Sequence, residues 1–577
     1  MTFFPHSVLA ALGLLAVTST ASADPAPLFP VATEVEALAE AAGILAVDLK
    51  DDTSADDLRS LEASFGLTFR ASSLWSRDHT KVELAAVDPS RLVDLVARLR
   101  GDPRVEDAEP LGLMFASFVP NDPLYAEKQW HITRVGAESA WEYGCGRGVT
   151  VAVIDTGVAC FDKEPFSRGT DLAGTRCTGG YNFVNDAEPA FDDHGHGTHV
   201  AGTIAQTTHN GKGAAGLAHC ATLMPIKVLT ARGWGTTAHV ADGIRYAADH
   251  GAQVMNLSLG GASGSRILER AVKYAQKKGV LVVAAAGNSG GAVGYPAAYA
   301  GVVAVSATDS NDRVAWFSSR GTEVVLAAPG VSVTQQTVCD GGKNHCEVFG
   351  TFSGTSMASP HVAGGAALLL GLGVTEPRAL RATMERTAIS KGEPTLYGAG
   401  LVDIAGAARD IHWHRFAWRA LALLALGAIV ARRIGSKGGT VVRGALTVVG
   451  ALLGAVGLIP FAPLLHLRGL TGPVQIVTEL LMRPLGEWDL AWSAEVHRYL
   501  PLGSALPTVV LTAFLFGVRS LRGFTGGLAL GTSAFLTHLA VAGDVAFVGG
   551  TFLLRGFCVA NVLLCLWIAR VALDAKK

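Results

Sequence analysis

Three reactive side chains lie in glycine-rich segments of the sequence. Asp155 ends the apolar run Val-Ala-Val-Ile-Asp, His196 lies in His-Gly-His-Gly-Thr-His, and Ser356 lies in Gly-Thr-Ser-Met-Ala. A serine hydroxyl is a poor nucleophile near neutral pH unless a base within about 3 Å removes its proton. An imidazole oriented by a carboxylate is such a base, so these three residue types predict nucleophilic catalysis.

The three segments, in the order Asp, His, Ser, resemble those of the subtilisin-like serine proteases, and the resemblance covers roughly residues 120–410. It implies that Ser356 is the nucleophile, His196 the general base and then acid, and Asp155 the carboxylate that orients the imidazole. It also implies that Asn288, in Ala-Ala-Ala-Gly-Asn, donates its side-chain amide to the oxyanion. This chemistry requires no cofactor.

The same resemblance indicates where polypeptide substrates bind. An extended peptide would add to one rim of the cleft as a β-strand. No charged residue lies in the matching segments, so we expect a preference for apolar P1 side chains. The two rims and the base of the first pocket are assigned to Ser258, Leu259, Gly260, Gly233, Gly235 and Gly294.

A structural calcium ion is a further expectation. Residues 207–214 resemble the calcium loop of the family, which implies Asn210 and Asp171 as ligands. The histidines of the His196 segment are an alternative metal cluster, but no carboxylate or cysteine is placed to complete it. Residues 211–216 match G-x-G-x-x-G, yet they precede a strand, which disfavours a dinucleotide site.

The start of the chain has the pattern of a secretory signal peptide. Residues 8–17 are apolar and are followed by Ala-Ser-Ala at 21–23, so we predict a signal peptide over residues 1–23. Export to an oxidising compartment makes disulfides expected. Six cysteines allow 15 pairings. Cys145 and Cys220 each precede a strand, and these strands are neighbours in the family's sheet, which favours the pair Cys145–Cys220. The pairs Cys160–Cys177 and Cys339–Cys346 are favoured because each closes a short loop.

Short β-branched runs alternate with helical stretches over the central part of the chain. This pattern predicts an α/β fold with a mostly parallel sheet and helices on both faces. The expected strands are 149–154, 223–228, 254–257, 280–285 and 302–305, and the expected helices are 238–249, 267–277 and 360–370.

Upstream, residues 42–110 predict a small ferredoxin-like α+β unit. We expect strands at 44–49, 67–75, 81–87 and 105–109 and helices at 56–65 and 89–100. The unit resembles the inhibitory propeptide of the family. The resemblance implies that residues 24–117 act as an intramolecular inhibitor and are removed by autoproteolysis between Met114 and Ser117, leaving a catalytic domain of residues 118–410.

The rest of the chain predicts an all-α membrane domain over residues 411–577. The whole sequence of 577 residues is 49% hydrophobic and only 17% charged, which indicates membrane segments. Five transmembrane helices are expected, within one, at 416–430, 444–465, 502–518, 525–543 and 556–569.

The charges suggest an orientation for this membrane domain. Residues 411–577 contain 15 Lys and Arg against 6 Asp and Glu, whereas residues 1–410 contain 32 against 43. The acidic body argues against nucleic-acid binding. Basic residues at 432–443, 519–522 and 570–577 predict cytoplasmic loops and a catalytic domain on the extracytoplasmic side of a bacterial inner membrane. The charges that fit a membrane helix poorly are Arg415, Arg419 and Arg555.

Several other residues of the tail leave alternatives open. Cys558 and Cys565 are expected to be small buried residues. His466, His538 and Asp544 are interfacial anchors or part of an ion path.

The sequence therefore predicts an exported, membrane-anchored serine endopeptidase made as a precursor. One alternative is a membrane sensor or transport component that keeps a protease-like domain only to bind peptides. Another is an enzyme whose tail has a catalytic role of its own.

Overall fold

The computed structural model describes residues 43–111, 120–187, 189–343, 347–465 and 473–576. The predicted signal peptide and the cleavage site between Met114 and Ser117 lie outside the described residues. The chain divides into two compact units, residues 1–116 and residues 117–577.

The first unit is an antiparallel sheet with the strand order β2-β3-β1-β4 and two main helices, as expected for a ferredoxin-like fold. Leu45, Val47, Leu61, Leu95 and Leu99 form the centre of its core. Its elements are β1 (Ile44–Leu49), α3 (Ala55–Phe65), β2 (Arg70–Ala71), α4 (Leu74–Asp78), β3 (Val82–Ala86), η1 (Pro89–Arg91), α5 (Leu92–Leu99) and β4 (Val105–Pro110).

The prediction of a strand over residues 67–75 is wrong. Only Arg70 and Ala71 pair with β3, and the chain then turns into the helix α4. The side chain of Ser73 accepts a hydrogen bond from the backbone N–H of Ser76 and caps this helix. In a strand, this N–H group would pair with the neighbouring strand. The serine side chain binds it instead, so the local hydrogen bond ends the extended segment.

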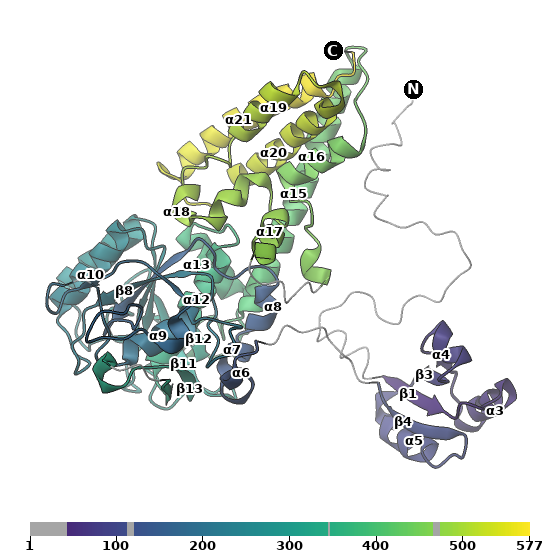
Figure 1. Cartoon of the computed structure of the whole chain (residues 1–577), viewed down its shortest axis with the longest axis horizontal. Helices are drawn as coiled ribbons and strands as arrows, with labels where there is room; N and C mark the ends of the chain where they lie inside the picture. Colours follow the sequence, from purple (N-terminus) through teal and green to yellow (C-terminus); the bar gives the residue numbers. More distant parts are fainter. Residues whose placement is uncertain (1–42, 112–119, 188, 344–346, 466–472, 577) are drawn as a thin grey trace. The chain divides into compact units, whose positions relative to one another are not determined.

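The second unit contains an eight-stranded sheet with all strand pairs parallel (Figure 1). Its order is β12-β11-β10-β9-β5-β8-β6, and β7 also pairs with β8. The five strands predicted from the sequence are confirmed with small shifts of their ends. The strands are β5 (Thr150–Asp155), β6 (Arg176–Cys177), β7 (Tyr181–Asn182), β8 (Thr222–Lys227), β9 (Val254–Leu257), β10 (Leu281–Ala285), β11 (Val303–Thr308) and β12 (Val324–Pro329).

Alternate residues of the central strand β5 face opposite sides of the sheet. Val151 and Val153 belong to one core cluster, and Ala152 and Ile154 belong to the other. The first cluster includes residues of α9 (His196–Ala205) and α12 (Thr355–Leu370), and the second includes residues of α10 (Thr237–Asp249) and α11 (Arg266–Lys277). Helices therefore cover both faces, as predicted.

Smaller elements surround this core. They are α6 (Pro123–Lys128), α7 (Trp130–Arg134), α8 (Ala137–Trp141), η2 (Thr170–Leu172), β13 (Val333–Gln336), η3 (Asp340–Gly342), β14 (Phe349–Phe352), α13 (Pro377–Thr387) and α14 (Pro394–Tyr397).

One long helix, α15 (Ile404–Gly435), joins the sheet-containing part to the C-terminal helices (Figure 1). Its first turns place Ile404, Ala407 and Ile411 in the same core cluster as the strands. The helix passes without interruption through the predicted domain boundary at Asp410. We call residues 411–577 the helical region.

The helical region contains α16 (Ala445–Ala455), η4 (Ala462–Leu465), α17 (Pro473–Leu481), η5 (Leu485–Ala491), α18 (Ala494–His497), α19 (Leu506–Leu515), η6 (Arg519–Leu521), α20 (Arg522–Ala542) and α21 (Gly550–Ala572). In its described part, two helical stretches are long and apolar enough to cross a membrane, residues 519–542 and 550–572.

The spans predicted at 444–465 and 502–518 take a different form. They contain the 11-residue α16 and the 10-residue α19, each about 15 Å long, which is half the thickness of a bilayer core. Helix α16 ends before Gly457, whose φ of 93° is left-handed, and Pro460 follows. An apolar run thus continues beyond the point where the helix stops.

Helix α20 packs against α16 through glycines. A Cβ atom at Gly527 would lie 2.0 Å from the carbonyl oxygen of Thr447, and one at Gly531 would lie 2.2 Å from that of Ala451. At the facing positions on α16, a Cβ atom would lie 2.2 Å from the backbone of α20 at Gly450 and 2.7 Å from it at Gly454. Small residues at this spacing allow the backbones of two helices to approach closely.

Candidate active site

Asp155 and His196 meet at the carboxyl end of β5. Asp155 is the last residue of the strand, and His196 is the first residue of α9. Nδ1 of His196 lies 2.7 Å from Oδ1 of the fully buried Asp155. Gly197 permits this approach, because a Cβ atom there would lie 2.1 Å from the carbonyl oxygen of Gly157. The carboxylate thus fixes the imidazole through one ring nitrogen and leaves Nε2 available.

The electrostatic surroundings favour the protonated imidazole. Burial alone lowers the pKa of His196, but the charge of Asp155, the hydrogen bond to it and the charge of Asp192 together raise the pKa above its usual value of 6.5. A raised pKa makes the ring a stronger proton acceptor once it is neutral.

Asp192 positions the histidine segment and was not predicted from the sequence. Its buried side chain accepts hydrogen bonds from the backbone N–H groups of His194, Gly195 and Thr198 and from two threonine hydroxyls. The available signal was an acidic residue just before the histidine motif, in Phe-Asp-Asp-His.

Ser356 lies in the first turn of α12 and is held against the segment that follows β9. Its Oγ donates a hydrogen bond to the carbonyl oxygen of Ser258 at 3.1 Å, and the Ser258 hydroxyl donates to the carbonyl oxygen of Ser356 at 2.7 Å. Among the described residues, no hydrogen bond joins Ser356 to His196. Apo enzymes often show this, because the bond to the base tightens only when substrate binds.

Asn288 is oriented by the residue that precedes the serine. Its Oδ1 accepts hydrogen bonds from the backbone N–H and the hydroxyl of Thr355, at 2.8 and 2.9 Å. A Cβ atom on Gly354 would lie 3.4 Å from Nδ2 of Asn288 and 3.7 Å from the backbone nitrogen of Ser356. The side-chain amide of Asn288 and the backbone nitrogen of Ser356 therefore lie near one point, and both can donate hydrogen bonds.

The predicted rims differ in exposure and in their contacts. Ser258 is buried, Leu259 is half-buried, and Gly260 is exposed, so this segment emerges from the sheet toward solvent. Gly233 and Gly235 are exposed and flank a tryptophan.

Gly294 lies close to the first rim. Its backbone N–H donates to the carbonyl oxygen of Ala286 at 2.9 Å, and a Cβ atom on Gly294 would lie 3.1 Å from the carbonyl oxygen of Gly261. Gly261 and Tyr295 exchange two backbone hydrogen bonds of 2.9 Å. The predicted pocket base thus joins the segment after β10 to the predicted rim.

Asn210 and Asp171 lie side by side, as the calcium prediction requires. Nδ2 of Asn210 donates to Oδ1 of Asp171 at 2.7 Å, and the backbone N–H of Ala214 donates to Oδ2 at 2.9 Å. Asp171 is fully buried, and this burial raises its pKa from 3.8 to about 6. The loop of residues 207–214 thus folds around a carboxylate that is costly to ionise.

A second carboxylate, Asp122, also contacts this loop and was not identified from the sequence. It is buried, and it accepts hydrogen bonds from the backbone N–H groups of His209 and Asn210 at 2.7 and 3.3 Å. Burial raises the pKa of Asp122, and its charge further raises the pKa of Asp171. Its only signal in the sequence is an aspartate directly before Pro123.

Disulfides join Cys145 to Cys220 and Cys160 to Cys177, the pairs expected from the sequence. Cys339 is also disulfide-bonded, and its expected partner Cys346 lies outside the described residues.

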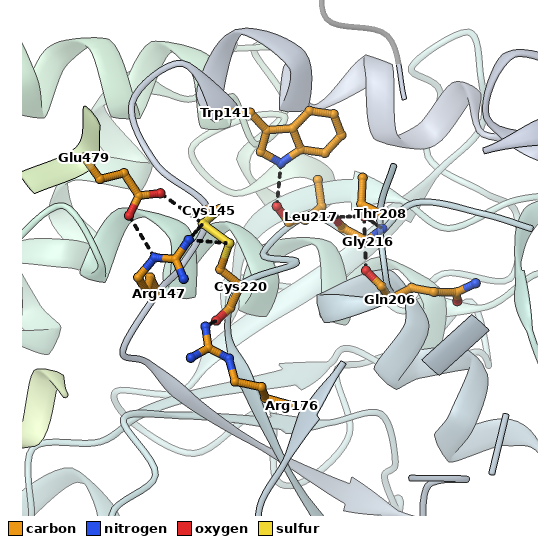
Figure 2. Close-up of a disulfide and its surroundings, with 10 residues drawn as sticks. All are labelled: Trp141, Cys145, Arg147, Arg176, Gln206, Thr208, Gly216, Leu217, Cys220 and Glu479. Atoms are coloured by element: carbon orange, nitrogen blue, oxygen red, sulfur yellow. Dashed lines mark hydrogen bonds and ion pairs between the residues drawn. A yellow bond between two sulfur atoms is a disulfide. The ribbon is translucent and has the colours of Figure 1, made fainter. Parts of the chain in front are cut away.

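The Cys145–Cys220 disulfide lies where residues 120–410, which we call the catalytic part, contact the helical region (Figure 2). Arg147 lies beside both sulfur atoms, and its Nε binds Glu479 of α17 at 3.1 Å. The backbone N–H of Ala494 donates to the carbonyl oxygen of residue 148 at 2.9 Å.

Comparison with known proteins covers most of the second unit. The model of the subtilase family matches residues 146–400, and a domain of unknown function matches residues 490–577. Thermitase of Thermoactinomyces vulgaris is 42% identical over 290 residues, which are 50% of this chain and 98% of that protein. Subtilisin Savinase of Lederbergia lenta is 44% identical over 283 residues, 48% of this chain and 98% of that protein. A solved protease of Pseudoalteromonas arctica is 32% identical with a TM-score of 0.46, covering 51% of this chain and 100% of that one.

Proposed function

We propose, since this chain belongs to the subtilase family of serine endopeptidases, that Ser356, His196 and Asp155 hydrolyse peptide bonds in its polypeptide substrates. Ser356 rotates from the carbonyl of Ser258 toward Nε2 of His196 and attacks the scissile carbonyl as the imidazole takes its proton. His196 then donates this proton to the leaving amine. Asp155 stabilises the imidazolium and keeps the ring in the required tautomer.

The developing oxyanion is bound by two donors, Nδ2 of Asn288 and the backbone N–H of Ser356. The bonds from Thr355 to Oδ1 of Asn288 support this role, because they fix the amide so that its nitrogen is the end left for the substrate. Donors that are already oriented need no reorganisation when charge develops.

The observation that carries this proposal is the 2.7 Å contact between His196 and the buried Asp155. A fluorophosphonate probe tests it on the full chain in a nonionic detergent. We expect labelling of the native protein, no labelling of Ser356→Ala, and unchanged labelling of Ser353→Ala, which removes an exposed hydroxyl three residues away. An unlabelled native protein would favour a peptide-binding module, and peptide hydrolysis by Ser356→Ala would indicate a second catalytic centre.

Substrate binds as an extended strand between the two rims. Ser258, Leu259 and Gly260 offer one edge, and Gly233 and Gly235 offer the other. The half-buried backbone at Gly294 and the absence of charged residues from the segments predicted to form the pocket support an apolar P1 preference. Faster cleavage after Arg or Lys than after Leu or Phe in a peptide panel would contradict this.

The unit formed by residues 24–117 acts as an intramolecular inhibitor until it is cleaved off. Its separate core supports a role as an independently folded propeptide. N-terminal sequencing of the processed protein, compared with Ser356→Ala, tests whether the chain cuts itself between residues 114 and 117.

The protein is exported and anchored in the bacterial inner membrane by its helical region. Two observations support this anchoring. The first is the two long apolar stretches, and the second is a set of large apolar side chains that are exposed on the helices. Large exposed apolar surfaces mark sites that contact a membrane or another protein. These side chains include Trp418, Leu421 and Ile429 of α15, Phe514 of α19, and Phe552, Leu563 and Trp567 of α21.

Several loops and helix ends gather at one end of the helical region. Val441 bridges to Asp574, the backbone N–H of Val442 donates to the carbonyl oxygen of Leu573, and Gly523 contacts Thr447. The basic residues at 432–443, 519–522 and 570–576 are in or beside these segments. This common end supports a cytoplasmic position for it and an extracytoplasmic catalytic domain.

A structural calcium ion binds beside the loop of residues 207–214. The donor set fits, because two buried carboxylates, Asp122 and Asp171, flank Asn210, and both have raised pKa values that a cation would relieve. The ion would neutralise these charges and hold the loop, and it has no part in the chemical steps.

A further inference from the structure

A small cavity lies where the helical region meets the catalytic part, and none of its lining residues belongs to the proposed active site. We call it the junction pocket. Its walls come from the first half of α15, the segment after α16 and residues 482–487, with Tyr143 and Leu372 on the catalytic side. Its volume is about 50 Å³. A water molecule needs about 10–15 Å³, so the pocket has room for a few waters or one small polyatomic anion.

Two arginines of α15 line the pocket, and both are paired. Nε of Arg415 binds Asp544 at 2.9 Å, and its terminal nitrogens donate to two carbonyl oxygens after α12 and approach Glu487 at 3.1 Å. Nη2 of Arg419 binds Glu487 at 2.5 Å. Two cations therefore face two anions, and their charges balance.

A third arginine in the wall, Arg483, has no such partner. Its exposed fraction is only 8%, and its Nη1 is buried without a hydrogen bond. In the described part of the chain no carboxylate pairs with it. The other buried acids of residues 473–497 have partners of their own, since Glu479 binds Arg147 (Figure 2) and Oδ1 of Asp489 lies 2.7 Å from Nδ1 of His497.

The neighbouring segment that is not described does not supply the missing anion. Residues 466–472 contain no Asp or Glu. Nε of Arg419 is also buried without an acceptor. A buried charge without a counter-ion strongly destabilises a folded protein. The pocket therefore has one excess positive charge and two guanidinium groups with N–H donors to spare.

We propose that the junction pocket binds one phosphate group, with the guanidinium of Arg483 as its main contact. A guanidinium matches the oxygens of a phosphate in charge and geometry and is the preferred group for binding it. Phe416 and Met482 form part of the wall, so the bound group can carry an apolar remainder.

The phosphate has two chemical sources, the headgroup of an anionic phospholipid and free inorganic phosphate. The lipid source depends on the membrane anchoring proposed above, whereas the phosphate site itself does not depend on peptidase activity. A phosphate in this pocket binds α15 and residues 482–487 at once, so it stabilises the junction between the catalytic part and the helical region.

Thermal unfolding tests this proposal on the full chain with Ser356→Ala, delipidated in an uncharged detergent. Inorganic phosphate, phosphatidylglycerol in mixed micelles, and chloride at equal ionic strength are added separately. We expect phosphate or phosphatidylglycerol to raise the melting temperature saturably by a few degrees, and chloride to have no comparable effect. Whichever of the first two acts identifies the source.

Arg483→Gln should melt no lower than its parent without ligand, because it removes an unpaired buried charge, and it should lose the ligand-induced rise. Arg483→Lys keeps the charge without the planar fork, so about a tenfold higher ligand concentration should be needed. Arg555→Gln removes an exposed charge of α21 and should respond like the parent. The proposal is overturned if neither ligand stabilises the parent, or if Arg483→Gln responds equally.

Discussion

Replacing Asp171 by asparagine tests the proposed calcium site through the free energy of unfolding. Without calcium, burial raises the pKa of this carboxyl from 3.8 to about 6, so the folded state binds a proton more tightly than the unfolded state. The stability that the proton contributes is complete below about pH 3.8 and is lost as the pH rises through about 6.

The expected magnitude follows from this shift. A rise of about two pKa units corresponds to about 3 kcal/mol, at about 1.4 kcal/mol per unit. Above about pH 6 the calcium-free protein is therefore less stable by this amount than it would be with a neutral side chain. Calcium at about 100 times its dissociation constant adds about 2.7 kcal/mol. Below pH 6 the ion must displace a proton, so its effect declines.

The assay is denaturant unfolding of the full chain with Ser356→Ala, which prevents self-digestion, at about pH 5 and about pH 8 with calcium or a chelator. Calcium should raise the free energy of unfolding at the higher pH and much less at the lower pH. Asp171→Asn should remove both the calcium effect and its dependence on pH. Asp186→Asn, which changes an exposed carboxylate of the same domain, should leave both intact.

Two results would refute the reasoning. The first is a calcium response of Asp171→Asn equal to that of its parent, which would place the ion elsewhere. The second is that, in the presence of a chelator, the free energy of unfolding of the parent changes between pH 4 and pH 6 in the same way as that of Asp171→Asn. In that case the carboxyl ionises in the folded protein without the cost that its burial implies.

Three further predictions concern the chemistry and the helix packing. Asn288→Leu removes an oxyanion donor, so kcat in peptide hydrolysis should fall about 10²–10³-fold with little change in KM, the magnitude known for such a donor in subtilisin. Asp155→Asn removes the charge that raises the pKa of His196, so the acid limb of the kcat/KM profile should move to lower pH while kcat falls about 10⁴-fold. Gly527→Leu should lower the melting temperature measured by circular dichroism in detergent, and Gly556→Leu should not, because a Cβ atom meets the backbone of α16 at 2.0 Å in the first and nothing within 4 Å in the second.

The parts of the fold that could be predicted depend on local signals. The central strands are unbroken β-branched runs, and the burial of every residue from Val151 to Asp155 matches that pattern. The strand predicted at 67–75 failed because a single serine cap competes with strand pairing. The spans at 444–465 and 502–518 failed because apolar composition does not fix where a helix stops. Gly457 and Pro460 were the cues for the first of these.

The site divides in the same way. Asp155, His196, Ser356 and Asn288 lie in recognisable motifs, and the structure shows the bonds that hold the first two together. Asp122 has no motif of its own, because its position beside residues 209 and 210 depends on folding over nearly 90 positions of the chain.

The arginines of α15 show the same limit. From the sequence, Arg415 and Arg419 are misplaced charges at the end of a membrane helix. In the structure Arg419 pairs with Glu487, 68 positions away along the chain, and Arg415 pairs with Asp544, 129 positions away. Long-range pairing of this kind leaves no local pattern. The charge that stays unbalanced, Arg483, can be recognised only after the others have been matched with their partners.

These pairings also bear on how the catalytic part is joined to the proposed membrane anchor. A flexible tether would separate the catalytic domain from its anchor by an exposed linker with few contacts. Here α15 begins in the catalytic core at Ile404 and continues as one helix into the helical region. Three sets of contacts cross the same junction. They are the contacts of the buried arginines, the Arg147–Glu479 ion pair, and the hydrogen bond that the backbone N–H of Glu376 donates to the carbonyl oxygen of Asp544. The helical region therefore completes the surface of the catalytic part, and the two are expected to move as one body.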